Sequence, residues 1–363
     1  MQALTSYPIR LSLGLMFLML GLVACKPDNP DPFDRESMLS NIGNEVLLPV
    51  HRSFLQQSQS LDSLTEVFVG NPTQENLGLL QNQWAFTKRS WKRVEVFEIR
   101  QASDLFLHNK IDKWETKAGF LQDNLEGSEA LTATFVENSG STSKGLPALE
   151  YFLFVEDALT TFTTAPLADR RLDYIKALTE NLFQQATALL NIWEGDVGAF
   201  VVETENFSKG SLNQLVNAQV SLLCEILFEK LGKPMGKDTG GTPIGTKAEA
   251  YRSGVSLSLI MENLKGVKAS FLGDPSLPGM DDLLDHLDAR SNNQMLSELI
   301  IQQLDLSIQK VAVAPGPLVK TVETDGPILE DLYQTIRTCL GYIKVDMANH
   351  LGILITFKDT DGD

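Results

Sequence analysis

Apolar residues recur every three or four positions over most of the chain, which is the period of an amphipathic helix. In the first such run they fall on one face: Met38, Ile42, Val46, Val50 and Phe54. Pro49 lies inside this run and predicts a kink, because proline lacks the backbone donor and crowds the preceding turn. The pattern therefore predicts a long first helix that bends near Pro49.

A second helix is predicted to begin at Asn71-Pro72-Thr73-Gln74. Asn71 is the expected N-cap, Pro72 suits the first helical position, and Gln74 is placed for a capping box. Its apolar face carries Leu77, Leu80, Trp84 and Trp91. The same stripe continues to Glu95 and Glu98, so it is either a core face that reaches solvent at its end or part of a binding site.

Later runs repeat this pattern with Gly, Pro and Asp between them. We expect a helix from about Leu167 that ends at Gly195, a connector over 201–210, and a helix over 212–231. The Gly-rich stretch 237–245 lacks the Gly-Lys-Ser/Thr ending of a phosphate loop and is predicted to be a linker. Three more helices are expected over 247–268, 293–311 and 327–350.

No alternation of strands and helices appears, which excludes a doubly wound sheet. We predict an all-α fold of two helical-bundle halves packed against each other. The N-terminal half would cover residues 36–205 and the C-terminal half residues 206–363.

The N-terminus resembles a bacterial lipoprotein signal. After Arg10, the apolar run 11–24 is too short to span a bilayer but suits a signal peptide. It ends in Leu22-Val23-Ala24-Cys25, which is similar to a lipobox, where cleavage leaves a lipid on the cysteine. We therefore predict a signal peptide over 1–24 and a lipidated, Pro- and Asp-rich tether over 25–35. The lipid on Cys25 would hold the exported chain on the outer membrane, on its periplasmic or surface face; an ordinary cysteine after a conventional signal is the alternative.

The charge balance limits the partners. The 363-residue chain carries a formal net charge of −17, which repels phosphate backbones and argues against nucleic acid. Cations, a basic protein partner of the cell envelope, or simple solubility all fit this charge. Cys224 and Cys339 lie in apolar helical patterns and are expected to be buried free thiols rather than a disulfide framework.

Sequence patterns for metal or nucleophilic chemistry are weak. His51, His108, His286 and His350 are isolated, without the local spacing of a metal site. No Gly-x-Ser-x-Gly motif supports a hydrolase triad. Residues 359–363 read Asp-Thr-Asp-Gly-Asp, like the start of a calcium loop, but stop before its twelfth position, which leaves at most a weak cation site.

Four segments together resemble the imelysin family. One is Gly145-Leu-Pro-Ala-Leu-Glu150-Tyr-Phe-Leu-Phe154, which is similar to the family's Gly-x-His-x-x-Glu segment. The others are Asn71–Thr73 leading into Gln83-Trp84, Lys230-Leu-Gly-Lys-Pro-Met-Gly236, and the stretch 344–357. They span nearly the whole chain after the signal. The resemblance implies an exported helical protein associated with bacterial iron acquisition, with iron or another divalent cation as the cofactor class left open.

One branch of that family is classed as metallopeptidases because of its His-x-x-Glu. In this chain Pro147 occupies the His position, and proline cannot ligate a metal. The segment Tyr251-Arg252-Ser253-Gly254 resembles what a Pro-type subgroup carries in the second half.

The residues expected at a ligand site are Glu150, Trp84, Arg89, Arg252 and Ser253. We predict Glu150 in the first turn of its helix, where stabilisation of the helix dipole is the alternative role. Arg89 and Arg252 are the cations expected to pair with Glu150 or an anionic ligand, although Arg89 can equally be a solvated surface residue. No catalytic residue is assigned.

Three functions follow. The first is a binding or accessory lipoprotein of iron or iron-chelate uptake, with its ligand in the crevice between the halves. The second is an imelysin-type metallopeptidase, which lacks a ligand at Pro147. The third is a non-enzymatic scaffold for protein interactions on the envelope.

Overall fold

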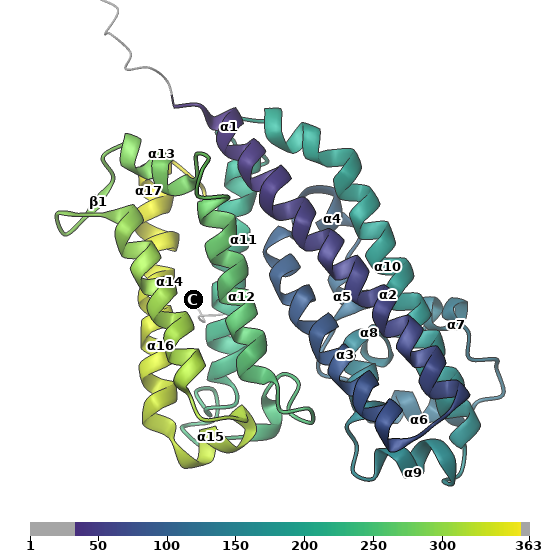
Figure 1. The fold of residues 1–363 in the computed structure, drawn as a ribbon. Helices are drawn as coiled ribbons and strands as arrows, with labels where there is room; N and C mark the ends of the chain where they lie inside the picture. The colour runs from purple at the N-terminus through teal and green to yellow at the C-terminus, as the bar shows by residue number, and fades with distance from the viewer. Residues whose placement is uncertain (1–32, 357–363) are drawn as a thin grey trace, which may run out of the picture. The chain divides into compact units, whose positions relative to one another are not determined.

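In the computed structural model, residues 33–356 are described, and the chain from Arg35 onward forms one compact unit. The predicted signal peptide, Cys25, most of the tether and the Asp-rich segment 359–363 lie outside the described residues. The described part is almost entirely helical, which confirms the all-α prediction (Figure 1).

The first group of helices is built on three long elements, α2 (Leu48–Gly70), α3 (Gln74–Val94) and α10 (Ala168–Val202). They run alongside one another in Figure 1, and α2 packs against both of the others. Short elements fill the space around them: α1 (Arg35–Ser40), the π-helical η1 (Asn41–Leu47), η2 (Glu95–Phe97), α4 (Arg100–Asp104), α5 (Leu107–Ile111), α6 (Ala118–Glu126), α7 (Ala133–Asn138), η3 (Ser141–Ser143), α8 (Gly145–Leu153) and α9 (Ala158–Thr163).

The second group follows the connection 203–210. It comprises α11 (Ser211–Cys224), the π-helical η4 (Glu225–Gly232), η5 (Gly245–Lys247), α12 (Ser256–Leu272), α13 (Met280–His286), α14 (Leu296–Val313), α15 (Leu318–Thr324), α16 (Gly326–Gly341), the π-helical η6 (Tyr342–Met347) and α17 (Ala348–Leu351). A short hairpin with two residues in each strand, β1 (Arg290–Ser291) and β2 (Gln294–Met295), precedes α14. Because α12 packs against α3 as well as α14, the division into two bundle halves near residue 205 stays a prediction.

The helix predicted to end at Gly195 does not end there. In α10 the helix continues through Gly195 and Gly198 to Val202. A glycine inside a helix costs about 1 kcal/mol relative to alanine. Burial of Trp193 and Phe200 on either side of Gly195 outweighs that local preference.

The predicted Asn71 cap is also wrong. Thr73 is extended and its hydroxyl accepts the Asn76 N–H at 3.2 Å, so α3 begins two residues later. The Asn71 carbonyl instead accepts the Asn76 side-chain amide at 2.8 Å. The first predicted run is observed as α1, η1 and α2, with Pro49 in the first turn of α2 after the π-helical segment.

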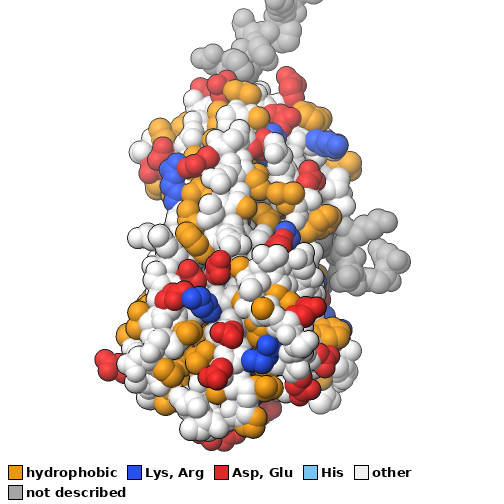
Figure 2. All heavy atoms as spheres, turned by 90° about the vertical axis from the view of Figure 1, so that its right-hand side faces the viewer, with side chains coloured by type: hydrophobic (Ala, Val, Ile, Leu, Met, Phe, Trp, Pro, Cys, Tyr) orange, Lys and Arg blue, Asp and Glu red, His pale blue; other side chains and the backbone are white. Residues whose placement is uncertain are grey.

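The remaining expectations concern the cysteines and the surface. Cys224 and Cys339 are buried and form no disulfide with each other, and burial raises the pKa of the Cys339 thiol to about 12. No helix within residues 33–356 combines the length and apolar content needed to cross a bilayer. On the face shown in Figure 2, Asp and Glu outnumber Lys and Arg, in keeping with the net charge of −17.

Candidate functional site

Helix α8 begins where only glycine fits. Gly145 has a φ of 70°, and a Cβ there would lie 2.2 Å from the Ile111 carbonyl oxygen at the end of α5. A side chain would therefore have to displace the backbone of α5, which explains the glycine of this motif. Since α8 starts at Gly145, Glu150 lies in its second turn, and the prediction that it occupies the first turn is wrong. A pure dipole role is correspondingly weakened, because that effect falls off beyond the first turn.

Glu150 is 5% exposed, and its carboxylate accepts hydrogen bonds from a single residue of the second group of helices. Its Oε1 accepts the Ser253 backbone N–H at 2.9 Å and the Ser253 hydroxyl at 3.1 Å. Burial raises the pKa of Glu150, while the Ser253 hydrogen bonds and the charges of Lys88 and Arg252 only partly offset it. Glu150 is thus a buried carboxylate held by dipoles rather than by a salt bridge.

A tight turn presents Ser253 to Glu150. Ala250 and Gly254 have φ values of 54° and 72°, and the Ser253 hydroxyl also lies 3.0 Å from the Ala250 carbonyl oxygen. Within this turn the Arg252 guanidinium lies over two aromatic rings, 4.5 Å from the Tyr251 centroid and 5.2 Å from that of Tyr151. Both rings can hold the guanidinium by cation–π attraction.

Beside this contact is a pocket of about 290 Å³. Its lining comprises Trp114, Glu115, Thr116, Pro147, Glu150, Thr246, Lys247, Ala248, Ala250, Tyr251 and Arg252. At its rim the Lys247 ammonium lies 3.0 Å from the Glu115 carboxylate, and both side chains are about half exposed, at 46% and 54%. The pocket therefore offers two cationic groups, aromatic faces and one buried carboxylate.

The structure brings Glu150, Arg252 and Ser253 together but places Trp84 and Arg89 elsewhere. Trp84 is fully buried, and its indole N–H donates to the Leu146 carbonyl at 2.9 Å, which ties α8 to α3. Arg89 donates to the Ser258 hydroxyl at 3.2 Å and thus joins α3 to α12. Neither side chain lines the pocket.

Behind the pocket, three lysines and three carboxylates form a buried cluster: Lys88, Lys92, Glu95, Asp112, Lys230 and Glu249. Each is at most 6% exposed. The Lys92 ammonium is central, 2.6 Å from Glu95, 2.6 Å from Asp112 and 2.7 Å from Glu249.

Lys230 joins this buried cluster from η4. Its ammonium lies 3.3 Å from Glu95 and donates to the Asn263 side chain at 2.8 Å. The Asn263 amide in turn donates to Glu95 at 2.6 Å and to the Lys92 carbonyl at 2.9 Å. The cluster therefore links α3 to η4 and α12 through charged and polar contacts away from water.

Opposite charges within the cluster favour the ionised forms of Glu95, Glu249 and Lys92. Burial raises the pKa of Glu95, but Lys230 and Lys92 more than offset it and bring that pKa to about 2. The same lysines hold the pKa of Glu249 well below its usual range. The surrounding carboxylates hold the pKa of Lys92 above its usual value despite burial. Ammonium groups held in this way, as in Lys92 and Lys230, make poor bases near neutral pH.

Comparison with known proteins decides the family. The model of the imelysin family, peptidase M75, matches residues 47–335. The chain belongs to the imelysin family.

Two solved structures share this imelysin fold. An imelysin-like protein from Psychrobacter arcticum 273-4 has a TM-score of 0.74 at 19% identity, over 89% of this chain and 97% of its own. A protein from Parabacteroides distasonis ATCC 8503 named as an iron-regulated protein A precursor has a TM-score of 0.71 at 17% identity, over 88% and 97%. At these identities the likeness shows the fold alone. No curated protein sequence matches the chain.

The residues of this imelysin pocket do not fit a zinc centre. Catalytic zinc takes three protein ligands, mostly His with Glu, Asp or Cys. The pocket lining offers the carboxylates of Glu150 and Glu115 and contains no His or Cys. Pro147 stands on α8 one turn before Glu150, and no group of three His, Cys, Asp or Glu suited to a metal occurs within residues 33–356.

The histidines lie apart from the imelysin pocket. His51 is buried near Trp193, with its Nδ1 2.7 Å from the Leu47 carbonyl, and burial lowers its pKa to about 4. His108 pairs with Glu98 at 3.3 Å. Burial lowers the pKa of His108, but the hydrogen bond and charge of Glu98 more than compensate and raise it to about 9.

The buried cluster is what sequence reasoning missed. Lys88 and Lys92 lie between Trp84, Trp91 and Glu95 at spacings of three or four residues, so they share the apolar stripe of α3. A lysine inside such a stripe is a signal of a buried ion pair, since lysine is almost never fully buried unless it is paired. The partners Asp112, Lys230 and Glu249 come from distant segments, and no local pattern marks them.

Proposed function

We propose that this imelysin-family chain is a lipid-anchored cell-envelope protein that binds a carboxylate-bearing iron chelate in the Glu150–Arg252 pocket. The observation that carries the proposal is the Arg252 guanidinium, which lies over the rings of Tyr151 and Tyr251 and lines a 290 Å³ pocket together with the buried Glu150. Such a protein would serve iron acquisition as a binding or accessory component, together with other proteins of the envelope.

The chemistry of the pocket favours a chelate over a bare ion. Arg252 forms no salt bridge with a described residue, and its planar fork suits a carboxylate. Lys247 adds an ammonium at the rim, where it is paired with Glu115, and the Trp114 and Tyr251 rings add flat apolar surface. In a chelate the organic ligand supplies the metal donors, so the protein needs no histidine.

Two further features agree with this function. A protein of the same fold is named as iron-regulated. A lipid on Cys25 would keep the pocket at the outer membrane, where an imported chelate passes.

The test measures the binding of ferric citrate to residues 26–363 by isothermal titration calorimetry. We expect saturable binding that is at least tenfold weaker in Arg252→Gln, because a charged hydrogen bond to carboxylate contributes about 1.5–3 kcal/mol. The matched control is Arg52→Gln, since Arg52 is an exposed arginine paired with Glu194 on the outside of α2 and α10. Absence of saturable binding, or equal binding by Arg252→Gln and wild type, would refute the proposal.

The other two functions give different results. Proteolysis that is sensitive to chelators and disappears in Glu150→Gln would support a metallopeptidase. Capture of an envelope protein that is unaffected by Arg252→Gln would support a scaffold.

A further inference from the structure

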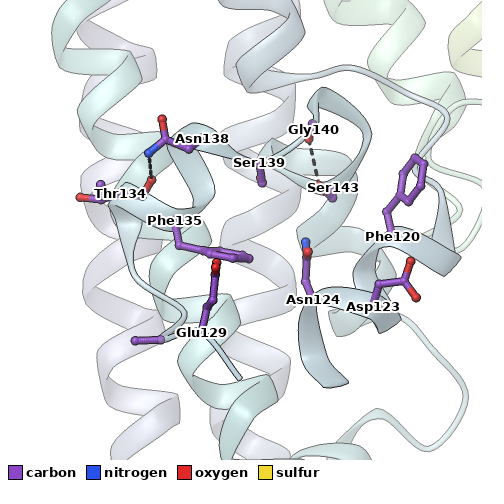
Figure 3. A pocket seen from close by; sticks show the side chains of 11 residues that line it. Phe120, Asp123, Asn124, Glu129, Thr134, Phe135, Asn138, Ser139, Gly140 and Ser143 are labelled. Atoms are coloured by element: carbon purple, nitrogen blue, oxygen red, sulfur yellow. Dashed lines mark hydrogen bonds between the residues drawn. The ribbon is translucent and has the colours of Figure 1, made fainter. Parts of the chain in front are cut away.

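A second pocket, of about 590 Å³, lies between α6 and α7 and shares no lining residue with the first (Figure 3). We propose that it binds a small organic cation, a protonated amine or a guanidinium carried on an apolar stem. Its lining comprises Phe120, Asp123, Asn124, Glu129, Ala130, Thr134, Phe135, Asn138, Ser139, Gly140 and Ser143.

Several hydrogen-bond donors of this pocket are already used within the protein. The Asn124 amide N–H donates to the Tyr174 hydroxyl at 2.7 Å, and that of Asn138 donates to the Thr134 carbonyl at 2.9 Å. Both Ser139 and Ser143 donate their hydroxyls to nearby carbonyls. These bonds use donors and leave oxygen lone pairs for a ligand that is rich in N–H groups.

The charges in this pocket are of one sign. Asp123 and Glu129 form no salt bridge within the described part of the chain, and the lining contains no Lys, Arg or His. Two carboxylates that are not neutralised internally attract a cation of the right size. The same charges disfavour an anionic ligand.

Two phenyl rings supply the apolar part of the site. Phe120 is 50% exposed, and Phe135 is half-buried. In Figure 3 the Phe135 ring extends from α7 into the pocket, while Phe120 and Asp123 stand on the opposite side with Asn124 between. The Lys117 ammonium lies 5.7 Å from the Phe120 ring centroid, so this ring attracts a cation on one face and a ligand would meet the other.

Helix α10 fixes one wall of the pocket from behind. The Arg170 guanidinium donates to three carbonyls, of Leu125 at 2.7 Å and of Asn124 and Glu129 at 3.1 Å, which holds the end of α6 and the loop that carries Glu129. Polar groups held in this way lose little freedom when a ligand binds.

The other wall is fixed as well. The buried Tyr174 hydroxyl donates to the Ser143 carbonyl at 2.9 Å and accepts from Asn124. Thr132 caps α7 by accepting the Phe135 N–H at 3.2 Å, which sets the position of that ring. Both sides of the pocket are therefore ordered without a ligand.

The ammonium group can come from a free diamine or from a Lys or Arg side chain of another protein. The test titrates residues 26–363 with cadaverine, with agmatine, and with a short peptide that contains one lysine, at low ionic strength. We expect saturable binding of at least one of them. Tighter binding of the peptide would assign the site to a protein partner, and tighter binding of the free amines to a small molecule.

Two variants and one control separate this site from general attraction to an acidic protein. Asp123→Asn with Glu129→Gln should weaken binding at least tenfold, and Phe120→Ala should weaken it severalfold. All three side chains are at the surface, so folding should be retained, as an unchanged melting temperature would show. The control Glu126→Gln removes one charge from α6, the helix of Asp123, outside the lining and should change affinity less than twofold.

Three results would overturn the proposal. They are no saturable binding of any probe, equal weakening by Glu126→Gln and the double variant, and equally tight binding of the neutral analogue 1,5-pentanediol. None of these bears on the chelate site, because Arg252 and Glu150 are untouched.

Discussion

Glu249 and Glu150 are both buried glutamates at the contact between the two groups of helices, 2% and 5% exposed, yet their pKa values move in opposite directions. Glu249 lies within 3.0 Å of Lys88 and 2.7 Å of Lys92, and its pKa falls. Glu150 receives only an N–H and a hydroxyl from Ser253, and its pKa rises. At equal burial, partner charge decides the sign. A carboxylate paired with lysines is held in its charged form, whereas one that receives only N–H and O–H donors is not.

The largest effect should come from breaking the lysine cluster. Lys92→Met removes the ammonium shared by Glu95, Asp112 and Glu249 and leaves buried carboxylates with too little positive charge. We expect the free energy of unfolding to fall by about 3–5 kcal/mol, measured by urea denaturation. Arg93→Met is the control. The Arg93 side chain is next to Lys92 in the sequence but is 48% exposed, so its loss should lower the free energy of unfolding by less than about 1 kcal/mol. Equal losses in both variants would show that the cluster has no special role.

An intermediate effect should follow pH through His108. Its pKa is raised from 6.5 to about 9 beside Glu98, so the stabilisation by its positive charge is fully present below pH 6.5 and is lost as pH rises towards 9. The stability difference between wild type and His108→Gln should therefore shrink over that range, by on the order of 2 kcal/mol. Thermal denaturation at pH 6, 7.5 and 9 measures it. A difference that stays constant with pH would contradict the assigned ion pair.

The smallest effect should come from Glu150→Gln. The amide oxygen of the variant can still accept both Ser253 donors. Because the pKa of Glu150 is raised in the folded protein, ionisation of its carboxyl group at higher pH destabilises the fold. We expect the stability at pH 7 to change by less than about 1 kcal/mol in either direction, and the variant to lose the drop in stability that wild type shows as pH rises through the Glu150 pKa. Melting temperatures from pH 4 to pH 7.5 measure both. A loss comparable to that of Lys92→Met would show that Glu150 is held by a cation after all.

Helical periodicity predicted most of the fold because each long helix buries a continuous apolar face. Its errors lie at helix ends. Gly195 is a local stop signal, but α10 passes through it because Trp193 and Phe200 are buried on either side. Near residue 247 the predicted helix begins late, at Ser256, because Ala250 and Gly254 adopt positive φ in the turn that presents Ser253. Tertiary contacts decide such ends, and a single sequence does not record them.

For the candidate site, motifs predicted the residues of the turn and of α8 but not the rotation of α3. Successive residues on a helix point about 100° apart, so Arg89 and Lys88 face different neighbours. The charge of Lys88 acts on Glu150, while Arg89 reaches Ser258. Trp84 shares the Lys88 stripe and is buried for that reason. Following the stripe of Trp84 would have selected Lys88 instead of Arg89.

The lysine pair on α3 also limits how the polypeptide can be dissected. Their counter-charge Glu249 lies beyond the 203–210 connection. Asn263, also beyond it, donates to the Lys92 carbonyl at the same contact. A fragment that stops at that connection would expose this buried contact to water and lose the carboxylate that Lys88 and Lys92 share. The intact protein should accordingly melt in one calorimetric peak, with amide exchange slowest along α3 and α12.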